Sequence, residues 1–264
     1  MAENGFATVL PLFHAIPSWY ILLGMKKIST LVATKPKTSA ATKKRTKDVA
    51  VDVNAFDDIR DAVSKLKRER IISTAVELFH QNGLSKTTLE AVAEKMNFTK
   101  PFIYSHFKSK DELLAEICSR GIRASLDALN RAVVSDASPT EKMRVLANDF
   151  MLAVLENQGH IAIYNREEKQ LSADSREAIN HLRREFDRKF VSLIKEGVTT
   201  GEFTVDDVEL AALAISGIVS WSYVWYLPNG RLSKSEAAEK IADLVLAMVQ
   251  AKPVKRKRAA GKPA

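Results

Sequence analysis

Residues 68–114 read RERIISTAVELFHQNGLSKTTLEAVAEKMNFTKPFIYSHFKSKDELL, and this stretch decides the fold. Its pattern predicts four helices in quick succession. The third, around Thr99–Phe107, is short and has Ile103 and Phe107 as apolar anchors four residues apart on one side. The other side carries Lys100, Phe102, Ser105 and His106, with Tyr104 at its edge. A short helix divided in this way is typical of the recognition helix of a helix-turn-helix unit.

The neighbouring segments carry the start and stop signals of three further helices. The first helix is expected to end before Gly83, which suits a left-handed backbone position. The second is expected to open at Thr87, with Glu90 three residues later forming a capping box, and to end in a tight turn at residues 97–99. Ser109 and Glu112 form another capping box, which opens a long fourth helix.

This segment resembles the DNA-binding domain of the tetracycline-repressor (TetR) family of bacterial regulators. The resemblance covers about 45 residues of the chain. The matching positions are Ala75, Leu78, Phe79, Gly83, Thr87, Thr88, Ala93, Thr99, Lys100, and the run from Tyr104 to Leu113. Phe102 departs from the family, which has a small residue there, so the base sequence read by this chain is expected to be unusual. The alternative is a three-helix core module that binds no nucleic acid.

Five residues are predicted to hold the phosphate backbone. Thr87 and Thr88 would meet a phosphate at the start of the second helix, because helix N-termini are good anion sites. Tyr104, His106 and Lys110 would contact the backbone beside the recognition helix and fix its position on the duplex.

Five more residues are predicted to lie at or near the base edges. Lys100, Phe102 and Ser105 would face the major groove, with Phe102 able to contact a thymine methyl group. Thr99 and Pro101 open the recognition helix, where the missing N–H of proline costs no hydrogen bond.

The charge is distributed unevenly along the chain. Residues 65–110 contain nine Lys or Arg and four acidic residues, a net charge of +5, whereas residues 111–251 contain sixteen basic and twenty-two acidic residues, a net charge of −6. Two segments, 35–47 and 252–264, carry six positive charges each and no acid. A basic unit attached to an acidic body fits a protein that meets phosphate at one end. The two basic tails are expected to be disordered, either adding non-specific attraction to DNA or having no role.

The first 64 residues are expected to be an extension and linker, mostly disordered. Its apolar run, Phe6–Leu23, has the composition of a signal peptide or membrane anchor. The absence of a basic segment before it argues against a signal, and Pro11 and Pro17 interrupt a span that is already short. A translation start at Met25 is another interpretation. A membrane partner is therefore not expected.

The rest of the sequence predicts an all-α protein of about nine helices. Few glycines and prolines, a single cysteine and the lack of an alternating strand pattern support this class. Further helices are expected near 139–155, 161–171, 174–196, 206–227 and 233–251. Ser138 with Glu141 is expected to cap the first of these, and Ser233 with Glu236 the last. We therefore expect a three-helix DNA-binding domain at 65–110 and a larger ligand-binding and dimerisation domain at 111–251, which the basic tail at 252–264 follows.

The last two predicted helices are best explained as a dimer interface. The helix at 206–227 is apolar on nearly every side and must be buried all round. Two helices from each subunit would form a four-helix bundle across a two-fold axis, as the resemblance also implies, although an ordinary buried pair would explain the pattern too. The run from Gly201 to Ser233 also resembles the branch of the family that senses acyl-coenzyme A thioesters in fatty-acid and steroid breakdown.

Catalysis is not expected. The five histidines and Cys118 show no metal-ligand spacing, and the sequence has no nucleophile elbow, phosphate-binding loop or dinucleotide fingerprint. Neither a metal nor a cofactor is expected.

The sequence therefore predicts a cytoplasmic, nucleoid-associated homodimer that represses transcription and leaves a palindromic operator when it binds a small apolar effector, such as an acyl-coenzyme A. Two alternatives remain: an efflux regulator that senses aromatic or cationic drugs, and a non-specific architectural DNA-binding protein. The candidate ligand-binding residues are Phe150, Tyr164, Arg166, Phe186, Trp221 and Trp225, each of which also fits ordinary packing.

Overall fold

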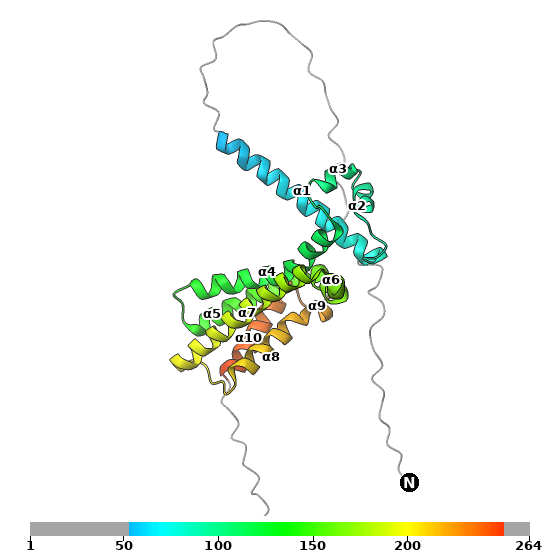
Figure 1. Ribbon diagram of the computed structural model, residues 1–264. Helices are drawn as coiled ribbons and strands as arrows, with labels where there is room; N and C mark the ends of the chain where they lie inside the picture. Colours follow the sequence, from blue (N-terminus) through cyan, green and yellow to red (C-terminus); the bar gives the residue numbers. More distant parts are fainter. Residues whose placement is uncertain (1–52, 251–264) are drawn as a thin grey trace, which may run out of the picture. The chain divides into compact units, whose positions relative to one another are not determined.

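The structure is a computed structural model that describes residues 53–250, with side chains from Ile59 onward. Within this range the chain contains ten α-helices, one 3-10 helix and no strand, which confirms the predicted all-α class (Figure 1). The elements are α1 (Val53–Asn82), α2 (Leu89–Lys95), α3 (Lys100–Tyr104), α4 (Lys110–Val134), α5 (Pro139–Glu156), α6 (Gln158–Glu167), η2 (Glu168–Gln170), α7 (Ala173–Thr200), α8 (Val208–Ser220), α9 (Ser222–Trp225) and α10 (Lys234–Gln250). The apolar run at Phe6–Leu23, Met25 and both basic tails lie outside the described residues.

Helix α1 begins earlier than the sequence indicates. It runs for 30 residues from Val53, so residues 53–64 are helical, and the expectation that residues up to 64 form a mostly disordered extension was wrong for this part. Ile59, Val63 and Leu66 on these turns are exposed. This segment has no continuous apolar face to bury against the protein. Its sequence therefore lacks the periodic pattern from which a helix is normally predicted.

Side-chain caps fix most of the other helix boundaries. Ser138 and Glu141 form the expected capping box at α5, and Ser233 with Glu236 does the same before α10. At α4, the Ser109 hydroxyl accepts a hydrogen bond from the Glu112 backbone N–H, as expected. The Glu112 carboxylate, however, accepts from the N–H of Lys108 and not from that of Ser109, so the capping box is incomplete.

Two hydrophobic clusters hold the described helices together, and α4 belongs to both. Leu113, Leu114 and Ile117 on its first turns pack with α1–α3 and with residues from α6 and the start of α7. Leu126 and Leu129 further along α4 pack with the body helices α5, α7, α8 and α10. The first cluster therefore crosses the boundary predicted between residues 110 and 111.

A group of charged side chains joins α1 to α4 where the two clusters meet. The Arg120 guanidinium donates to both Glu69 carboxylate oxygens at 2.6 and 2.7 Å, and it lies 3.4 Å from Glu116. This bidentate geometry is the strong form of an ion pair and fixes orientation as well as distance. The hydrogen bond from Arg120 holds the pKa of Glu69 below its usual value, against the opposing effect of partial burial. Beside them on α6, burial and the neighbouring Arg120 lower the pKa of His160 to about 4.

The predicted apolar helix at 206–227 is divided at Trp221 into α8 and α9. It is not buried all round in the single chain, because Leu213 is 65% and Trp221 is 52% exposed. By length and composition alone, Val208–Trp225 is apolar enough to cross a membrane, and only 22% of it is buried in the structure. A partner surface would supply the burial that the sequence pattern requires.

The end of α7 generates a stability prediction. A Cβ atom added at Gly197 would lie 2.1 Å from the ring of Phe203, which is buried and donates its backbone N–H to the Gly197 carbonyl at 2.9 Å. We expect Gly197→Ala to lower the free energy of unfolding by about 1–3 kcal/mol, because the ring must move out of a filled space. Ser192→Ala on the exposed face of the same helix is the matched control. Thermal denaturation that gives equal midpoints for the two variants would contradict this packing.

Candidate nucleic-acid interface

The turn between α2 and α3 has the geometry of a Schellman motif. Asn97 takes a left-handed backbone with φ of 56° and donates its N–H to the Glu94 carbonyl at 3.0 Å. Phe98 donates its N–H to the Ala93 carbonyl at 2.9 Å, which completes the motif. Thr99 is then extended and begins α3. The predicted tight turn at residues 97–99 is thus present, with asparagine where glycine is most common.

Two fully buried side chains anchor α3, as the sequence predicts. Ile103 and Phe107 lie inside the cluster formed with α1, α2 and α4. The Arg68 guanidinium of α1 lies over the Phe107 ring, 4.0 Å from its centroid, and donates to the His106 carbonyl at 2.7 Å. These contacts fix the side of α3 that faces the protein, so its remaining residues are presented outward.

Most of the residues predicted to face the bases are exposed. Thr99, Lys100, Pro101 and Ser105 all lie on the solvent side of α3, and the Ser105 hydroxyl donates back to the Phe102 carbonyl at 2.7 Å. Phe102 itself is half-buried because its ring packs against neighbouring rings.

The predicted phosphate contact at Thr87 requires a correction. The cap of α2 is Thr88, whose hydroxyl accepts from the Ala91 backbone at 3.1 Å, so the helix does not open at Thr87 with a Thr87–Glu90 capping box. Thr87 is buried, and its hydroxyl is placed to donate to the carbonyls of Gly83 and Leu78. Thr88 remains exposed, and its hydroxyl could donate to a phosphate in place of the Glu90 carboxylate, whose pKa the Glu90 backbone N–H lowers most and the Thr88 hydroxyl helps to lower.

Two of the other predicted backbone contacts, Tyr104 and Lys110, already have hydrogen-bond partners inside the chain. The exposed Tyr104 hydroxyl donates to Glu90 at 3.0 Å, and this bond raises the pKa of Tyr104. Lys110 donates to the carbonyls of Leu84 and Thr87 at 3.0 and 3.2 Å, which ties α4 to the turn before α2. His106 is half-buried, and burial lowers the pKa of its imidazole, with Lys67 and Arg68 acting in the same direction.

Two residues at this surface were missed by sequence reasoning. Phe98 is 47% exposed and its ring stacks on Phe102 at a centroid distance of 4.3 Å. Lys67 of α1 places its ammonium group 5.8 Å from the Phe102 ring centroid. The four-residue spacing of Phe98, Phe102 and His106 was the available signal for a continuous row, but Phe98 lies before the predicted recognition helix and was not considered part of its surface.

The six predicted ligand-binding residues do not meet in one place. Phe150 and Phe186 pack on each other in the body core at 4.9 Å, whereas Tyr164 is buried in the other cluster under the guanidinium of Arg183. Trp221 and Trp225 are exposed.

Arg166 has partners of its own in the chain. Its guanidinium pairs with Glu167 and donates to the Phe79 carbonyl of α1 at 2.8 Å. The six candidates therefore do not line one common cavity in the single chain. Their aromatic or basic identity did not reveal which surface each residue faces.

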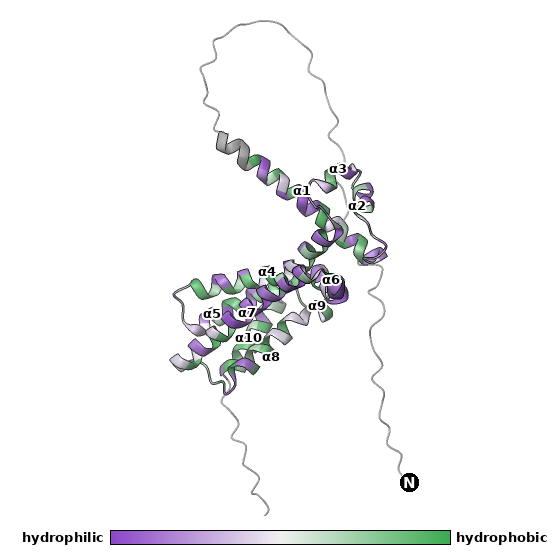
Figure 2. Cartoon of the chain, viewed as in Figure 1, coloured by the Kyte–Doolittle hydropathy of each residue, from purple (hydrophilic) through white to green (hydrophobic). Residues whose placement is uncertain are grey.

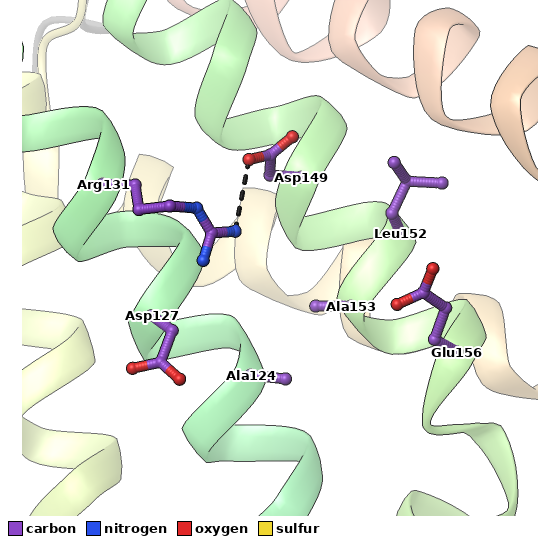
Figure 3. A pocket seen from close by; sticks show the side chains of 7 residues that line it. All are labelled: Ala124, Asp127, Arg131, Asp149, Leu152, Ala153 and Glu156. Carbon is purple, nitrogen blue, oxygen red and sulfur yellow. Dashed lines mark hydrogen bonds and ion pairs between the residues drawn. The ribbon is translucent and has the colours of Figure 1, made fainter. Parts of the chain in front are cut away.

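A hollow of about 330 Å³ lies between α4 and α5, and none of the predicted ligand residues lines it (Figure 3). It is lined by Ala124, Asp127, Arg131, Asp149, Leu152, Ala153 and Glu156. Arg131 and Asp149 form an ion pair across it at 3.3 Å, leaving Asp127 and Glu156 as an excess of negative charge (Figure 3). Among the described residues, no group of three or more His, Cys, Asp or Glu side chains is placed to hold a metal ion.

Comparison with known proteins agrees with this geometry. Residues 71–117 match the model of bacterial regulatory proteins of the tetR family, and residues 136–249 match a tetracyclin repressor-like C-terminal domain. A crystal structure of a TetR/AcrR-family regulator from Thermobifida fusca is 32% identical, with a TM-score of 0.56 over 68% of this chain and 96% of that one.

The chain belongs to the TetR family.

Two further proteins are similar to this chain. One is named a transcriptional repressor, and the other is a structure that contains a ligand and DNA. The transcriptional repressor KstR2 of Mycolicibacterium smegmatis is 28% identical over 182 residues, which cover 68% of this chain and 89% of KstR2. A structure of AibR in complex with isovaleryl coenzyme A and operator DNA is 24% identical, with a TM-score of 0.57 over 69% of this chain and 97% of AibR. Family membership confirms the prediction that this TetR-family protein is a DNA-binding transcriptional regulator and not an enzyme.

The exposed position of Lys100 generates a prediction for this TetR-family regulator. We expect Lys100→Ala to relax the preference at one base pair of each half-site by about 1–3 kcal/mol, because a base contact to its ammonium group is lost. Binding of labelled duplexes that vary at single positions measures this. Lys169→Ala, an exposed lysine of η2 remote from α3 in the chain, is the control, and identical sequence profiles for the two variants would rule out the contact.

Proposed function

We propose that the chain is a homodimeric transcriptional repressor that binds a palindromic operator through α2 and α3 and releases it when a small effector binds the body. In this proposal, residues 65–110 form the DNA-binding domain and residues 111–251 the effector and dimerisation domain. The observation that carries the proposal is α3 itself: a short helix with two buried anchors, an exposed outer side, and a rigid turn before it.

The outer side of α3 has the chemistry that DNA recognition needs. Lys100 and Ser105 offer donors toward base edges, and Thr88 offers a hydroxyl toward a phosphate. The net charge of +5 over residues 65–110 supports attraction to the duplex, and it makes affinity fall steeply with salt. Tyr104 would contact phosphate only by exchanging its Glu90 partner.

The dimer is supported by the distribution of exposed apolar side chains. Nine of the seventeen large exposed ones on the described chain lie between residues 210 and 248. They are Leu210, Leu213, Ile218, Trp221, Val224, Trp225, Leu227, Leu244 and Met248, which we call the apolar face. Most of them lie on α8 and α10, both of which carry apolar turns in Figure 2. A monomer in water rarely leaves such a group of large side chains uncovered, so we assign this face to a two-fold contact between copies.

For the effector we propose an acyl-coenzyme A or a related lipid-like acid. Support comes from KstR2 as a relative and from the structure of AibR with isovaleryl coenzyme A, together with the large, mostly apolar body. As a regulator of bacterial transcription the protein acts in the cytoplasm, and its association with the nucleoid is part of the proposal.

A cationic effector is a second candidate, and the hollow between α4 and α5 favours it. Asp127, Asp149 and Glu156 face a single arginine there, so the phosphates of a coenzyme A would be repelled while a cation would be attracted. This arrangement corresponds to the drug-sensing alternative.

The dimer assignment predicts the effect of a charge on the apolar face. We expect Leu213→Glu to convert the protein to monomers at micromolar concentration, since each dimer would have to bury two unpaired carboxylates. Operator affinity should fall with it, because both half-sites are needed at once. Sedimentation velocity of the full-length chain measures the first effect.

Val134→Glu is the matched control for this experiment. Val134 is more exposed than Leu213, at 81%, but it is the last residue of α4 and does not belong to the apolar face. If Val134→Glu stays dimeric and Leu213→Glu does too, the contact between copies lies elsewhere.

The effector proposal predicts that acyl thioesters loosen the operator complex. Linkage requires the operator to weaken thioester binding by the same factor, and a tenfold effect corresponds to about 1.4 kcal/mol. Fluorescence anisotropy of a labelled palindromic duplex, selected with the full-length protein, can be followed against short branched, long straight and polycyclic acyl-coenzyme A compounds, with free coenzyme A as the control.

The same titration separates the two effector classes. Release by a planar aromatic cation, weakened in Asp127→Asn and Asp149→Asn, would establish the second candidate and overturn the first. Arg166→Ala is not a clean probe of effector binding, because Arg166 holds the end of α1.

A further inference from the structure

The turn and the recognition helix share a row of rings that the function above does not use. Phe98 stacks on Phe102 at 4.3 Å with an angle of 18° between the rings, and Phe102 meets His106 edge-on at 5.1 Å. We propose that Phe98 and Phe102 form one aromatic unit that recognises two neighbouring 5-methyl groups in the major groove, so that each operator half-site contains a pair of adjacent thymines. The inference rests on the proposed operator binding and deepens it.

The backbone holds Phe98 in place before any DNA arrives. The Schellman hydrogen bond from its N–H to Ala93 fixes it relative to α2, and the extended Thr99 that follows fixes it relative to α3. Phe102 is held from the other side by His106 and by Lys67 of α1. The pair therefore loses little conformational freedom when it binds a ligand.

Exposure shows which ring offers the larger free surface. Phe98 is 47% exposed, whereas Phe102 is half-buried between Phe98 and His106. The thymine contact predicted for Phe102 alone is thus shared, and Phe98 supplies the larger part of the contact surface. An exposed phenyl ring is unfavourable in water, and covering apolar groups of a ligand would remove it from water.

The chemistry of the major groove decides what this pair can recognise. A phenyl ring neither donates nor accepts a conventional hydrogen bond, and the thymine methyl is the apolar group that base edges present there. The 4.3 Å between ring centroids is close to the axial step of about 3.4 Å between successive bases of one strand, to which helical twist adds a lateral displacement. Two stacked rings therefore match two successive methyl groups.

Cations lie on either side of this apolar row. Lys67 is beside Phe102, and Lys100 is exposed at the first position of α3. Lys67 can hold a phosphate of the strand whose bases meet the rings and supply affinity that does not depend on sequence. Lys100 is left for the base edge proposed for it above, next to the methyl groups that the rings select.

The test replaces single thymines by uracil, which removes the methyl group and leaves every hydrogen-bonding atom in place. The probe is the palindromic duplex selected from random DNA with the full-length protein. We expect one pair of adjacent thymines in each half-site where each replacement weakens binding about fourfold, the equivalent of about 0.8 kcal/mol for one buried methyl group. At every other thymine the replacement should have no effect.

Three variants assign the two contacts. In Phe98→Ala, the uracil penalty should disappear at one thymine of the pair and persist in weakened form at the other, because Phe102 loses its stacking partner. Phe98→Leu should retain both penalties, since an apolar side chain still covers the methyl group. Val145→Ala, another exposed apolar side chain on α5, is the control for a general loss of affinity. Circular dichroism melting shows that each variant is folded.

The outcomes separate this inference from the proposed function. If the wild-type protein prefers its selected palindrome yet tolerates uracil at every position, the methyl contact is wrong and operator binding stands. If Phe98→Ala leaves both uracil penalties unchanged, Phe98 takes no part. If no palindrome is enriched by selection, the proposed function fails before the question of methyl groups arises.

Discussion

The packing of α4 into both hydrophobic clusters is the contact on which the rest of the structure depends. Its first turns place Leu113 and Ile117 among the helices that present α3, and its later turns place Leu129 in the core of the body. Because protein interiors are close-packed, α4 cannot tilt in one cluster without moving side chains in the other. A change of packing in the body is therefore expected to reach the recognition helix through a single rigid element.

Helix α6 supplies a second connection between the same regions. At its start, the Gln158 amide donates to the Tyr223 and Tyr226 carbonyls at the end of α9, and toward its other end Arg166 donates to the Phe79 carbonyl of α1. The segment next to the apolar face is thus tied to the helix that carries Lys67 and Arg68. An effector that binds one arrangement of these helices better than another would shift the population between them, and the spacing of two recognition helices would change with it.

A residue's position in the fold could be predicted from sequence where its contacts are with residues nearby in the chain. The anchors Ile103 and Phe107 and the cap at Ser138 were predictable because helical spacing and capping act over a few residues. Thr87 was misplaced because two adjacent threonines give the same capping signal, and only the fold shows which one is buried. The helical residues 53–64 were missed because no buried apolar face marks them.

The surroundings of individual side chains were less predictable still. Lys110 was expected at a phosphate, but two backbone carbonyls contributed by a segment more than twenty residues earlier are its partners. Trp221 was expected in a cavity and lies on the apolar face, because composition shows that a residue is apolar but not which partner covers it. Phe98 was assigned to a turn, and its stacking on Phe102 emerged only from the geometry of that turn.

The proposed function depends above all on sequence-specific DNA binding by a dimer of this chain. An equilibrium titration of the full-length chain against its selected palindrome and against a scrambled duplex of equal length, at physiological salt, tests this most directly. We expect two chains on the palindrome and a preference of roughly 10³-fold or more over the scrambled duplex. Equal affinity for the two duplexes would contradict it and would favour a non-specific architectural role.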